Sequence, residues 1–259
     1  MNKNLKSKLY SQNFLTDKKL VKKLIADFGL TNKDLVYEIG CGNGIITQAL
    51  ALECAKVKTI EIDKKLLTQT KSRLQHFKNL EFIYGDFLRL PLPYSEYVIF
   101  VNIPFRISAD ILRKILEVKN SPAKAFLIIQ KETAQRWLGK PKINQVSVLY
   151  YPWFSFKIRH YLKKFHFRPM PKVEVVSLVI KKRKIPLVKN FNRELYFDFV
   201  SFAFNSFAPT LAQGLRHIFT KSEYRYISQN LKFAYQALPT QLTQMQWLAA
   251  FCLFSRFNY

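Results

Sequence analysis

The chain has 259 residues, which is long enough for one full catalytic domain and a small addition but short for two large domains. Its 42 lysine and arginine residues against 17 aspartate and glutamate residues give a formal net charge of +25 at pH 7, and this excess favours nucleic acid as the partner. The basic N-terminus lacks the apolar core of a signal peptide, and every apolar run is far shorter than the ~20 residues that span a bilayer, so no membrane partner is expected.

The first 182 residues alternate short β-branched or aromatic runs with helix-like stretches, which predicts an α/β fold. The expected strands are residues 35–39, 57–62, 81–84, 97–101, 125–129, 146–154 and 175–180. The expected helices are residues 45–52, 64–76 and 109–118. After a basic linker that ends in a proline, residues 183–259 show no strand pattern, and we expect a small all-helical domain with an aromatic core between Tyr196 and Phe207.

The cysteines Cys41, Cys54 and Cys252 are odd in number and widely spaced, and the four histidines are scattered. These positions predict neither a disulfide framework nor a metal site. We therefore expect a soluble, cytoplasmic protein without a metal, and a monomer.

A glycine-rich segment, Glu-Ile-Gly-Cys-Gly-Asn-Gly at 38–44, lies between an expected strand and an expected helix. Glycines there permit a tight turn and let backbone N–H groups approach a ligand closely. Alone the pattern is weak, because glycine turns join many strands to helices, and its spacing differs from the dinucleotide pattern.

Two acidic residues stand at the ends of the next two strands. Glu61 comes roughly 20 residues after the glycine loop, where a carboxylate accepts hydrogen bonds from both ribose hydroxyls. Asp86 follows the third strand and is placed to accept the amino group of an adenine, with Phe87 beside the ring. Together with Gly40, these strand ends predict a nucleoside cofactor site, and the absence of nearby lysines favours S-adenosylmethionine over a pyrophosphate.

The fourth strand runs into the tetrapeptide Asn102-Ile103-Pro104-Phe105. The exocyclic nitrogen of adenine is a poor nucleophile because its lone pair is delocalised into the ring. The Asn102 side-chain carbonyl and a backbone carbonyl next to the proline are placed to accept both amino hydrogens, which returns the lone pair for attack on a methyl group. Phe105 is placed to stack on the base after its extrusion.

The sequence as a whole resembles the RNA adenine dimethyltransferases, and in particular the erythromycin-resistance (Erm) family of ribosomal RNA adenine methyltransferases. The residues that carry the resemblance are the segments 11–15, 38–44, 59–63, 85–87, 102–105 and 167–173. The resemblance implies a class I methyltransferase (Rossmann-like) sheet with helices on both faces in 1–182, and an RNA-assisting helical domain in 183–259. It also implies transfer from S-adenosylmethionine, with S-adenosylhomocysteine as product.

Site residues carried over by position are Asn13, Leu15, Gly40, Glu61, Asp86 and Asn102 for the cofactor, and Asn102, Ile103, Pro104 and Phe105 for the reaction. Phe105 stands where a tyrosine is common in the family, and Arg106 stands where a smaller residue is usual. Stacking does not need the tyrosine hydroxyl. The expected RNA-binding residues are Lys8, Arg106, Arg136, Lys140, Lys163 and Lys164.

The resemblance leaves two branches of the superfamily open for this chain. The Erm branch methylates an adenine of large-subunit (23S) ribosomal RNA and confers resistance to macrolide, lincosamide and streptogramin B antibiotics. The KsgA-like branch dimethylates adenines of small-subunit (16S) RNA during assembly. Ile103 and the segment 217–221 resemble the Erm branch, whereas Gln130-Lys131-Glu132 resembles the KsgA-like branch. Erm is the favoured interpretation; a non-catalytic nucleic-acid-binding factor of this fold and a DNA adenine methyltransferase remain as alternatives.

Overall fold

The computed structural model of the protein describes residues 13–258, which form two compact units. The first unit contains the chain up to Ala134 together with Phe156–Lys182, and the second contains Gln135–Ser155 together with Arg183–Tyr259. The chain thus passes into the second unit after Lys182, and the segment 135–155 belongs to that unit as well. Among the described helices, none is long and apolar enough to cross a membrane.

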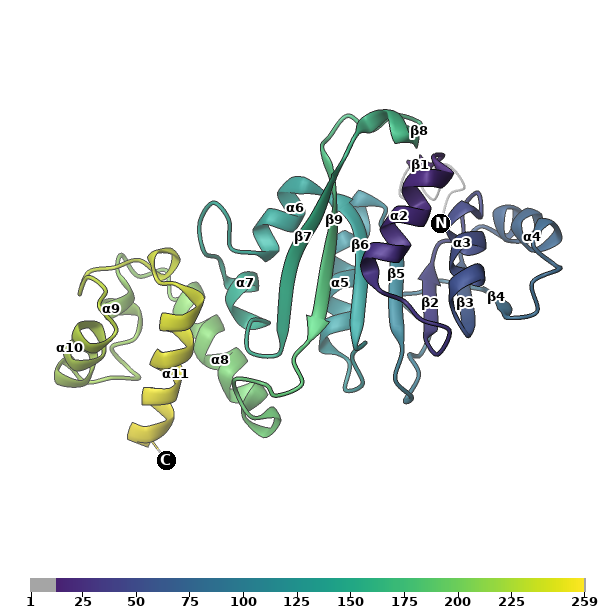
Figure 1. Ribbon diagram of the computed structural model, residues 1–259. Helices are drawn as coiled ribbons and strands as arrows, with labels where there is room; N and C mark the ends of the chain where they lie inside the picture. Colours follow the sequence, from purple (N-terminus) through teal and green to yellow (C-terminus); the bar gives the residue numbers. More distant parts are fainter. Residues whose placement is uncertain (1–12, 259) are drawn as a thin grey trace. The chain divides into compact units, whose positions relative to one another are not determined.

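The first unit is built on a seven-stranded sheet of order β4-β3-β2-β5-β6-β9-β7 (Figure 1). The pairs from β4 to β6 are parallel, and β9 runs antiparallel to β6. A second, two-stranded sheet pairs β1 with β8 antiparallel. The strands are β1 (Phe14–Leu15), β2 (Leu35–Ile39), β3 (Lys56–Glu61), β4 (Leu80–Tyr84), β5 (Val98–Asn102), β6 (Lys124–Gln130), β7 (Phe154–Leu162), β8 (Phe167–Arg168) and β9 (Val175–Lys182).

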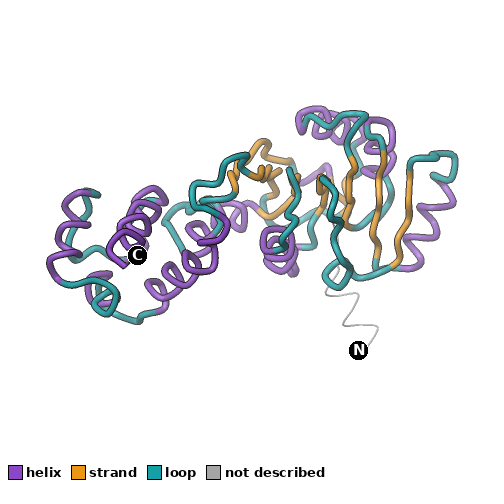
Figure 2. Tube along the Cα trace, turned by 90° about the horizontal axis from the view of Figure 1, so that it is seen from below, coloured by secondary structure: helices purple, strands orange, loops and turns teal. Residues whose placement is uncertain are grey.

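Helices cover both sides of this sheet, as the view along the strand layer shows (Figure 2). The α-helices that begin in the first unit are α2 (Lys18–Phe28), α3 (Ile45–Glu53), α4 (Lys64–Arg73), α5 (Ser108–Glu117) and α6 (Lys131–Trp137). Those of the second unit are α7 (Gln145–Leu149), α8 (Arg193–Asn205), α9 (Leu211–Gly214), α10 (Lys221–Asn230) and α11 (Gln244–Asn258). Short 3-10 turns are η1 (Phe105–Ile107), η2 (Lys164–His166), η3 (Asn190–Asn192) and η4 (Pro239–Gln241). The mixed sheet with helices on both faces confirms the predicted fold class.

Helix α2 shows how the core of the first unit is assembled. Its side chain at the N-cap, Asp17, accepts the Leu20 N–H at 3.0 Å, and Gly29 ends it in a left-handed conformation at φ +67°. The buried face of α2 ends in Phe28, whose ring packs edge-on against Phe100 of β5 and Phe126 of β6. The sheet is thereby covered where the parallel strands are continuously apolar.

One predicted strand is wrong. Residues 146–154 were expected to be extended, but α7 occupies Gln145–Leu149 and the strand β7 begins only at Phe154. A capping box stabilises the start of this helix. The Asn144 side chain accepts the Ser147 N–H, and the Ser147 hydroxyl accepts the Asn144 N–H. The apolar residues of the run pack into the aromatic core of the second unit, where Trp153 contacts Tyr196 edge-on, so their β-propensity is overridden by packing.

The second unit is helical around an aromatic core. Tyr196 and Phe199 are buried on α8, and both rings contact Phe251 of α11. The prediction of an aromatic core between Tyr196 and Phe207 is correct for these residues but wrong for Phe202 and Phe207, which are exposed.

Candidate functional site

A pocket opens where the parallel strands end, beside the point at which the strand order reverses between β2 and β5. Open α/β sheets bind ligands at such switch points. The empty space of the pocket, counted together with the open solvent at its mouth, is about 400 Å³. It is lined by Ile39, Gly40, Ile60, Glu61, Ile62, Gly85, Asp86, Phe87, Leu88, Pro104, Ile107 and Ile111.

The glycine loop forms the floor of this pocket. Gly40 has φ +81°, and its N–H donates to the Ile60 carbonyl at 2.8 Å, so the loop stays close to the end of β3. Gly44 has φ +72°, and a Cβ there would lie 2.6 Å from the Thr70 methyl group. Both positions therefore require glycine, the first for its backbone conformation and the second for space as well.

Glu61 ends β3 and is 2% exposed. One carboxylate oxygen accepts the Gly42 N–H at 3.2 Å and the other accepts the Asp63 N–H at 3.0 Å. A carboxylate offers about four acceptor sites. Glu61 is therefore oriented by the loop and keeps acceptor capacity for ligand hydroxyls.

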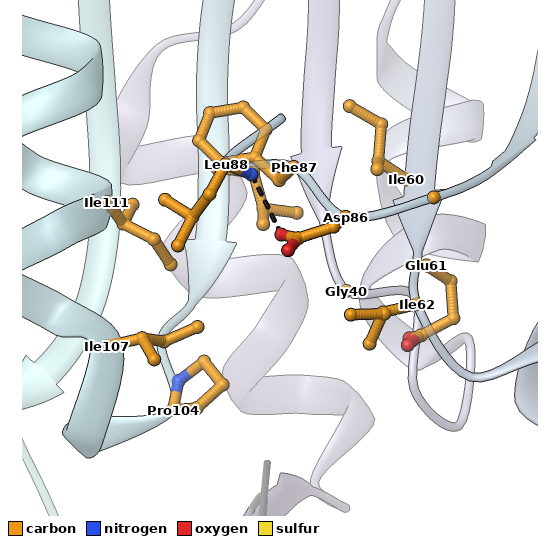
Figure 3. Close-up of a pocket in the computed structure, with 12 residues that line it drawn as sticks. Gly40, Ile60, Glu61, Ile62, Asp86, Phe87, Leu88, Pro104, Ile107 and Ile111 are labelled. Atoms are coloured by element: carbon orange, nitrogen blue, oxygen red, sulfur yellow. Dashed lines mark hydrogen bonds between the residues drawn. The ribbon is translucent and has the colours of Figure 1, made fainter. Parts of the chain in front are cut away.

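Asp86 projects into the pocket after β4, with Pro104, Ile107 and Ile111 on the other side (Figure 3). Its carboxylate accepts the Leu88 N–H at 3.0 Å. The pocket thus pairs two carboxylates with an apolar wall, and none of its lining residues is cationic.

Behind this wall, Lys114 of α5 holds the loop that follows Asp86. Its Nζ donates hydrogen bonds to the carbonyls of Phe87 and Leu90, and it lies 4.7 Å from the centroid of the Phe87 ring. Partial burial lowers the pKa of Lys114. Sequence reasoning missed this residue, because only the fold brings α5 to the loop.

Glu38, the first residue of the glycine segment, is fully buried below the loop. One carboxylate oxygen accepts the Thr47 hydroxyl at 2.7 Å, and the other has no hydrogen-bond partner among the described residues. Burial raises the pKa of Glu38 to about 7, against the lowering effect of the Thr47 hydrogen bond. The hydroxyls of Thr47 and Thr59 both lower the pKa of this carboxyl group, but burial outweighs them.

The N-terminal segment reaches the end of β5. Asn102 Nδ2 donates to the Asn13 backbone carbonyl at 2.8 Å, and Asn43 Nδ2 donates to the Leu15 carbonyl at 2.8 Å. Leu15 itself is buried and pairs with Phe167 across the β1–β8 sheet. The structure thereby brings Asn13 to Asn102, and Leu15 to Asn43, a residue that the sequence did not single out.

The rest of the tetrapeptide follows a tight path. Ile103 is buried and donates its N–H to the Ile128 carbonyl at 3.0 Å, and the Pro104 carbonyl accepts the Ile107 N–H at 3.1 Å. Phe105 is half-buried and packs on the edge of the core, whereas Arg106 is exposed.

The candidate RNA-binding residues lie in different parts of the chain. Arg106, Lys163 and Lys164 belong to the first unit, and Lys164 Nζ donates to the Lys172 carbonyl at 2.6 Å. Arg136 and Lys140 belong to the second unit and are exposed. Lys8 lies outside the described residues.

The fold and the pocket define a Rossmann-like methyltransferase. The family model described as "Ribosomal RNA adenine dimethylase" matches residues 2–255, and the chain belongs to this family. It is therefore an rRNA adenine methyltransferase, and the resemblance found in the sequence is confirmed at this level.

Relatives of both branches are similar to the chain. An "rRNA adenine N-6-methyltransferase" of Limosilactobacillus reuteri is 30% identical, over 99% of this chain and 98% of the relative. A "Ribosomal RNA small subunit methyltransferase A" of Mycoplasmopsis pulmonis is 34% identical, over 83% of this chain and 86% of the relative. The crystal structure of the 23S rRNA methyltransferase ErmE has the same fold, with a TM-score of 0.86 and 24% identity over 95% of this chain and all of that chain.

Methyltransferases of this family use S-adenosylmethionine, and the residues present fit it. The carboxylates of the pocket can accept hydrogen bonds from hydroxyl and amino groups, and its apolar wall can contact a ring. None of its lining residues is a cation that would bind a phosphate.

Proposed function

We propose that the protein transfers methyl groups from S-adenosylmethionine to the exocyclic amino group of one adenine in large-subunit (23S) ribosomal RNA, and so confers macrolide, lincosamide and streptogramin B resistance. The observation that carries the methyl-transfer chemistry is the bond from Asn102 Nδ2 to the Asn13 carbonyl at 2.8 Å. Because the amide nitrogen already donates to Asn13, the amide oxygen is the atom that would accept a hydrogen from the substrate amino group.

Three strand ends would hold the cofactor, which supplies an electrophilic methyl group when bound. Gly40 would lie against its methionine portion, since only backbone lines the pocket at that position. Glu61 would accept the ribose hydroxyls and Asp86 the adenine amino group. Leu15 and Asn13 would close the site from the N-terminal segment.

The second acceptor for the target amino group is the Ile103 carbonyl. The neighbouring Pro104 carbonyl already accepts the Ile107 N–H, whereas no hydrogen bond to the Ile103 oxygen is found within residues 13–258. Two fixed acceptors draw the amino nitrogen towards tetrahedral geometry, so its lone pair becomes available without a general base. Rate enhancement then comes from positioning and fixed dipoles.

Phe105 would stack on the extruded base, and stacking of this kind is worth roughly 1–3 kcal/mol. The exposed cations Arg106, Lys163 and Arg136, with Lys8, Lys140 and Lys164, would neutralise RNA phosphates. The large-subunit assignment rests on Ile103 and on the segment 217–221, which connects α9 to the start of α10; both resemble the Erm branch.

Expression in a macrolide-sensitive bacterium tests this assignment. The wild-type protein is expected to raise the erythromycin concentration that stops growth, and Asn102→Ala at equal expression is expected to leave it unchanged. Equal sensitivity of both strains would contradict the large-subunit assignment.

A second candidate is dimethylation of small-subunit RNA. The small-subunit methyltransferase of Mycoplasmopsis pulmonis shares 34% identity with the chain, and Gln130-Lys131-Glu132 resembles that branch. Restoration of small-subunit adenine dimethylation in a host that lacks it would favour this candidate.

A further inference from the structure

The outer face of strand β7 carries cations and aromatic rings in alternation. Exposed and half-buried residues alternate along it, and Lys157, Arg159 and Tyr161 share the exposed face. Lys163 and Phe165, which directly follow the strand, are exposed as well. We name these five residues the β7 track.

The opposite face of β7 is already occupied. His160 Nε2 lies 3.1 Å from the Asp27 carboxylate of α2, and its backbone N–H donates to the Ser177 hydroxyl at 3.0 Å. The alternation therefore divides β7 into a face that packs on the protein and a face that is offered to solvent.

The two rings of the track are exposed. Tyr161 is 66% exposed and Phe165 is 55% exposed, and a lysine ammonium lies within 6 Å of each, Lys131 at 5.9 Å and Lys163 at 5.7 Å. Strand β7 is the edge of the sheet, and lysines alone suffice to keep such an edge from pairing with another chain. Exposed aromatic rings on an edge strand favour pairing with another chain. Their presence beside the lysines of β7 is therefore better explained by binding of a ligand.

The cations of the track are available to a ligand. Lys157, Arg159 and Lys163 have no carboxylate within 4 Å among the described residues, whereas nearby Lys131 is bound to Glu174 at 2.8 Å. A stripe of unpaired cations with interleaved rings is complementary to single-stranded nucleic acid, which presents phosphates and unstacked bases together.

Strand β7 leads towards β8 and β1 of the same unit (Figure 1). After Phe165 the chain enters β8, which pairs with β1, and the residue before β1 is Asn13, which holds Asn102. We propose that the β7 track binds an unpaired RNA segment flanking the target adenine, with bases stacked on Tyr161 and Phe165 and phosphates on Lys157, Arg159 and Lys163. This inference rests on the proposed RNA substrate.

The test measures binding of a short single-stranded RNA and of its duplex to the full-length protein. The double variant Tyr161→Ala/Phe165→Ala is expected to bind the single strand at least about fivefold more weakly, with a much smaller change for the duplex. Tyr161→Phe keeps the ring and should bind as wild type. Tyr94→Ala is the matched control, because Tyr94 is 95% exposed and precedes β5, at the opposite end of the strand from Asn102.

Charge is tested separately. Lys157→Gln/Arg159→Gln/Lys163→Gln is expected to reduce the slope of log affinity against log salt by about 2, since each single-strand phosphate contact contributes about 0.7. Lys33→Gln, an exposed lysine before β2, should leave the slope unchanged. Cofactor binding of every variant is measured to show that the pocket is intact.

Single-strand binding that is unchanged in the aromatic double variant would overturn the track, even if methyl transfer persists. A wild-type protein that binds cofactor but neither binds RNA nor methylates it would overturn the proposed function as well.

Discussion

Asn102 Nδ2 donates a hydrogen bond to the backbone carbonyl of Asn13 at 2.8 Å, although 89 positions separate the two residues in the sequence. The bond joins the end of β5 to the N-terminal segment. Since a backbone carbonyl only accepts, it fixes which end of the Asn102 amide faces the substrate.

Replacement of Asn102 by alanine is therefore expected to abolish methyl transfer. The loss of one preorganised dipole at a reacting centre commonly lowers kcat by about 100- to 1,000-fold. Cofactor affinity, measured by calorimetry, should change by less than about tenfold, because the tether to Asn13 is one hydrogen bond. Full activity of the variant would remove Asn102 from the mechanism.

The variant Asn43→Ala distinguishes a residue that only holds the N-terminal segment from one that also takes part in the reaction. Asn43 holds Leu15 as Asn102 holds Asn13, at the same 2.8 Å, but it does not end a catalytic strand. We expect a cofactor Kd that rises by about 2- to 12-fold, the worth of the hydrogen bond to Leu15, and a kcat close to that of wild type. The variant also loses the bond in which Asn43 Oδ1 accepts the Ile45 N–H at the start of α3. A kcat loss as large as that of Asn102→Ala would show that both residues act only by holding the segment.

Glu38→Gln is expected to change how stability depends on pH. Burial raises the pKa of Glu38 from an ordinary 4.5 to about 7, so the folded state holds a proton that the unfolded chain releases at lower pH. The free energy of unfolding of the wild type therefore falls as pH rises from about 4.5 through about 7. Urea unfolding should show Glu38→Gln more stable than wild type at pH 8, by on the order of 1–3 kcal/mol, and little different at pH 4.5. Equal pH dependence of the two proteins would contradict this.

Lys114→Met is expected to loosen the wall beside Asp86. The variant loses the bonds to the Phe87 and Leu90 carbonyls, so the KM for cofactor should rise several-fold while kcat changes little. Arg113→Met, an exposed change on the same helix, is the control. A fall of kcat at unchanged KM would assign Lys114 a different role.

Salt tests the role of the excess positive charge. If the six proposed cations each contact a phosphate, RNA affinity should fall by about three orders of magnitude between roughly 50 and 200 mM salt. Filter binding across this range measures it, with cofactor binding as a reference that lacks phosphate. A flat response would contradict an electrostatic RNA surface.

The sheet could be predicted where a buried run is bounded by breakers, as at 35–39 before Gly40. The run at 146–154 misled the prediction, because the Asn144 capping box and aromatic packing decide its structure. Helix α2 was overlooked although its signals, Asp17 at the N-cap and Gly29 at the end, are in the sequence.

The meeting of Gly40, Glu61 and Asp86 in one pocket was predictable, since each stands at the end of a parallel strand or just after it and parallel strands end at one edge. Contacts made by residues distant in sequence were not predictable. Lys114 reaches its loop only through the α5 packing, and Asn13 contributes a backbone carbonyl, which no side-chain pattern encodes.

The most direct measurement is methyl transfer from labelled cofactor to deproteinised large- and small-subunit ribosomal RNA, with the modified base mapped by primer extension. A large-subunit methyltransferase should give a stop at one adenine of large-subunit RNA, and this stop should be absent with Asn102→Ala. Modification of small-subunit RNA alone would contradict the large-subunit assignment, and no transfer to either RNA would contradict the enzyme and leave a non-catalytic nucleic-acid-binding factor.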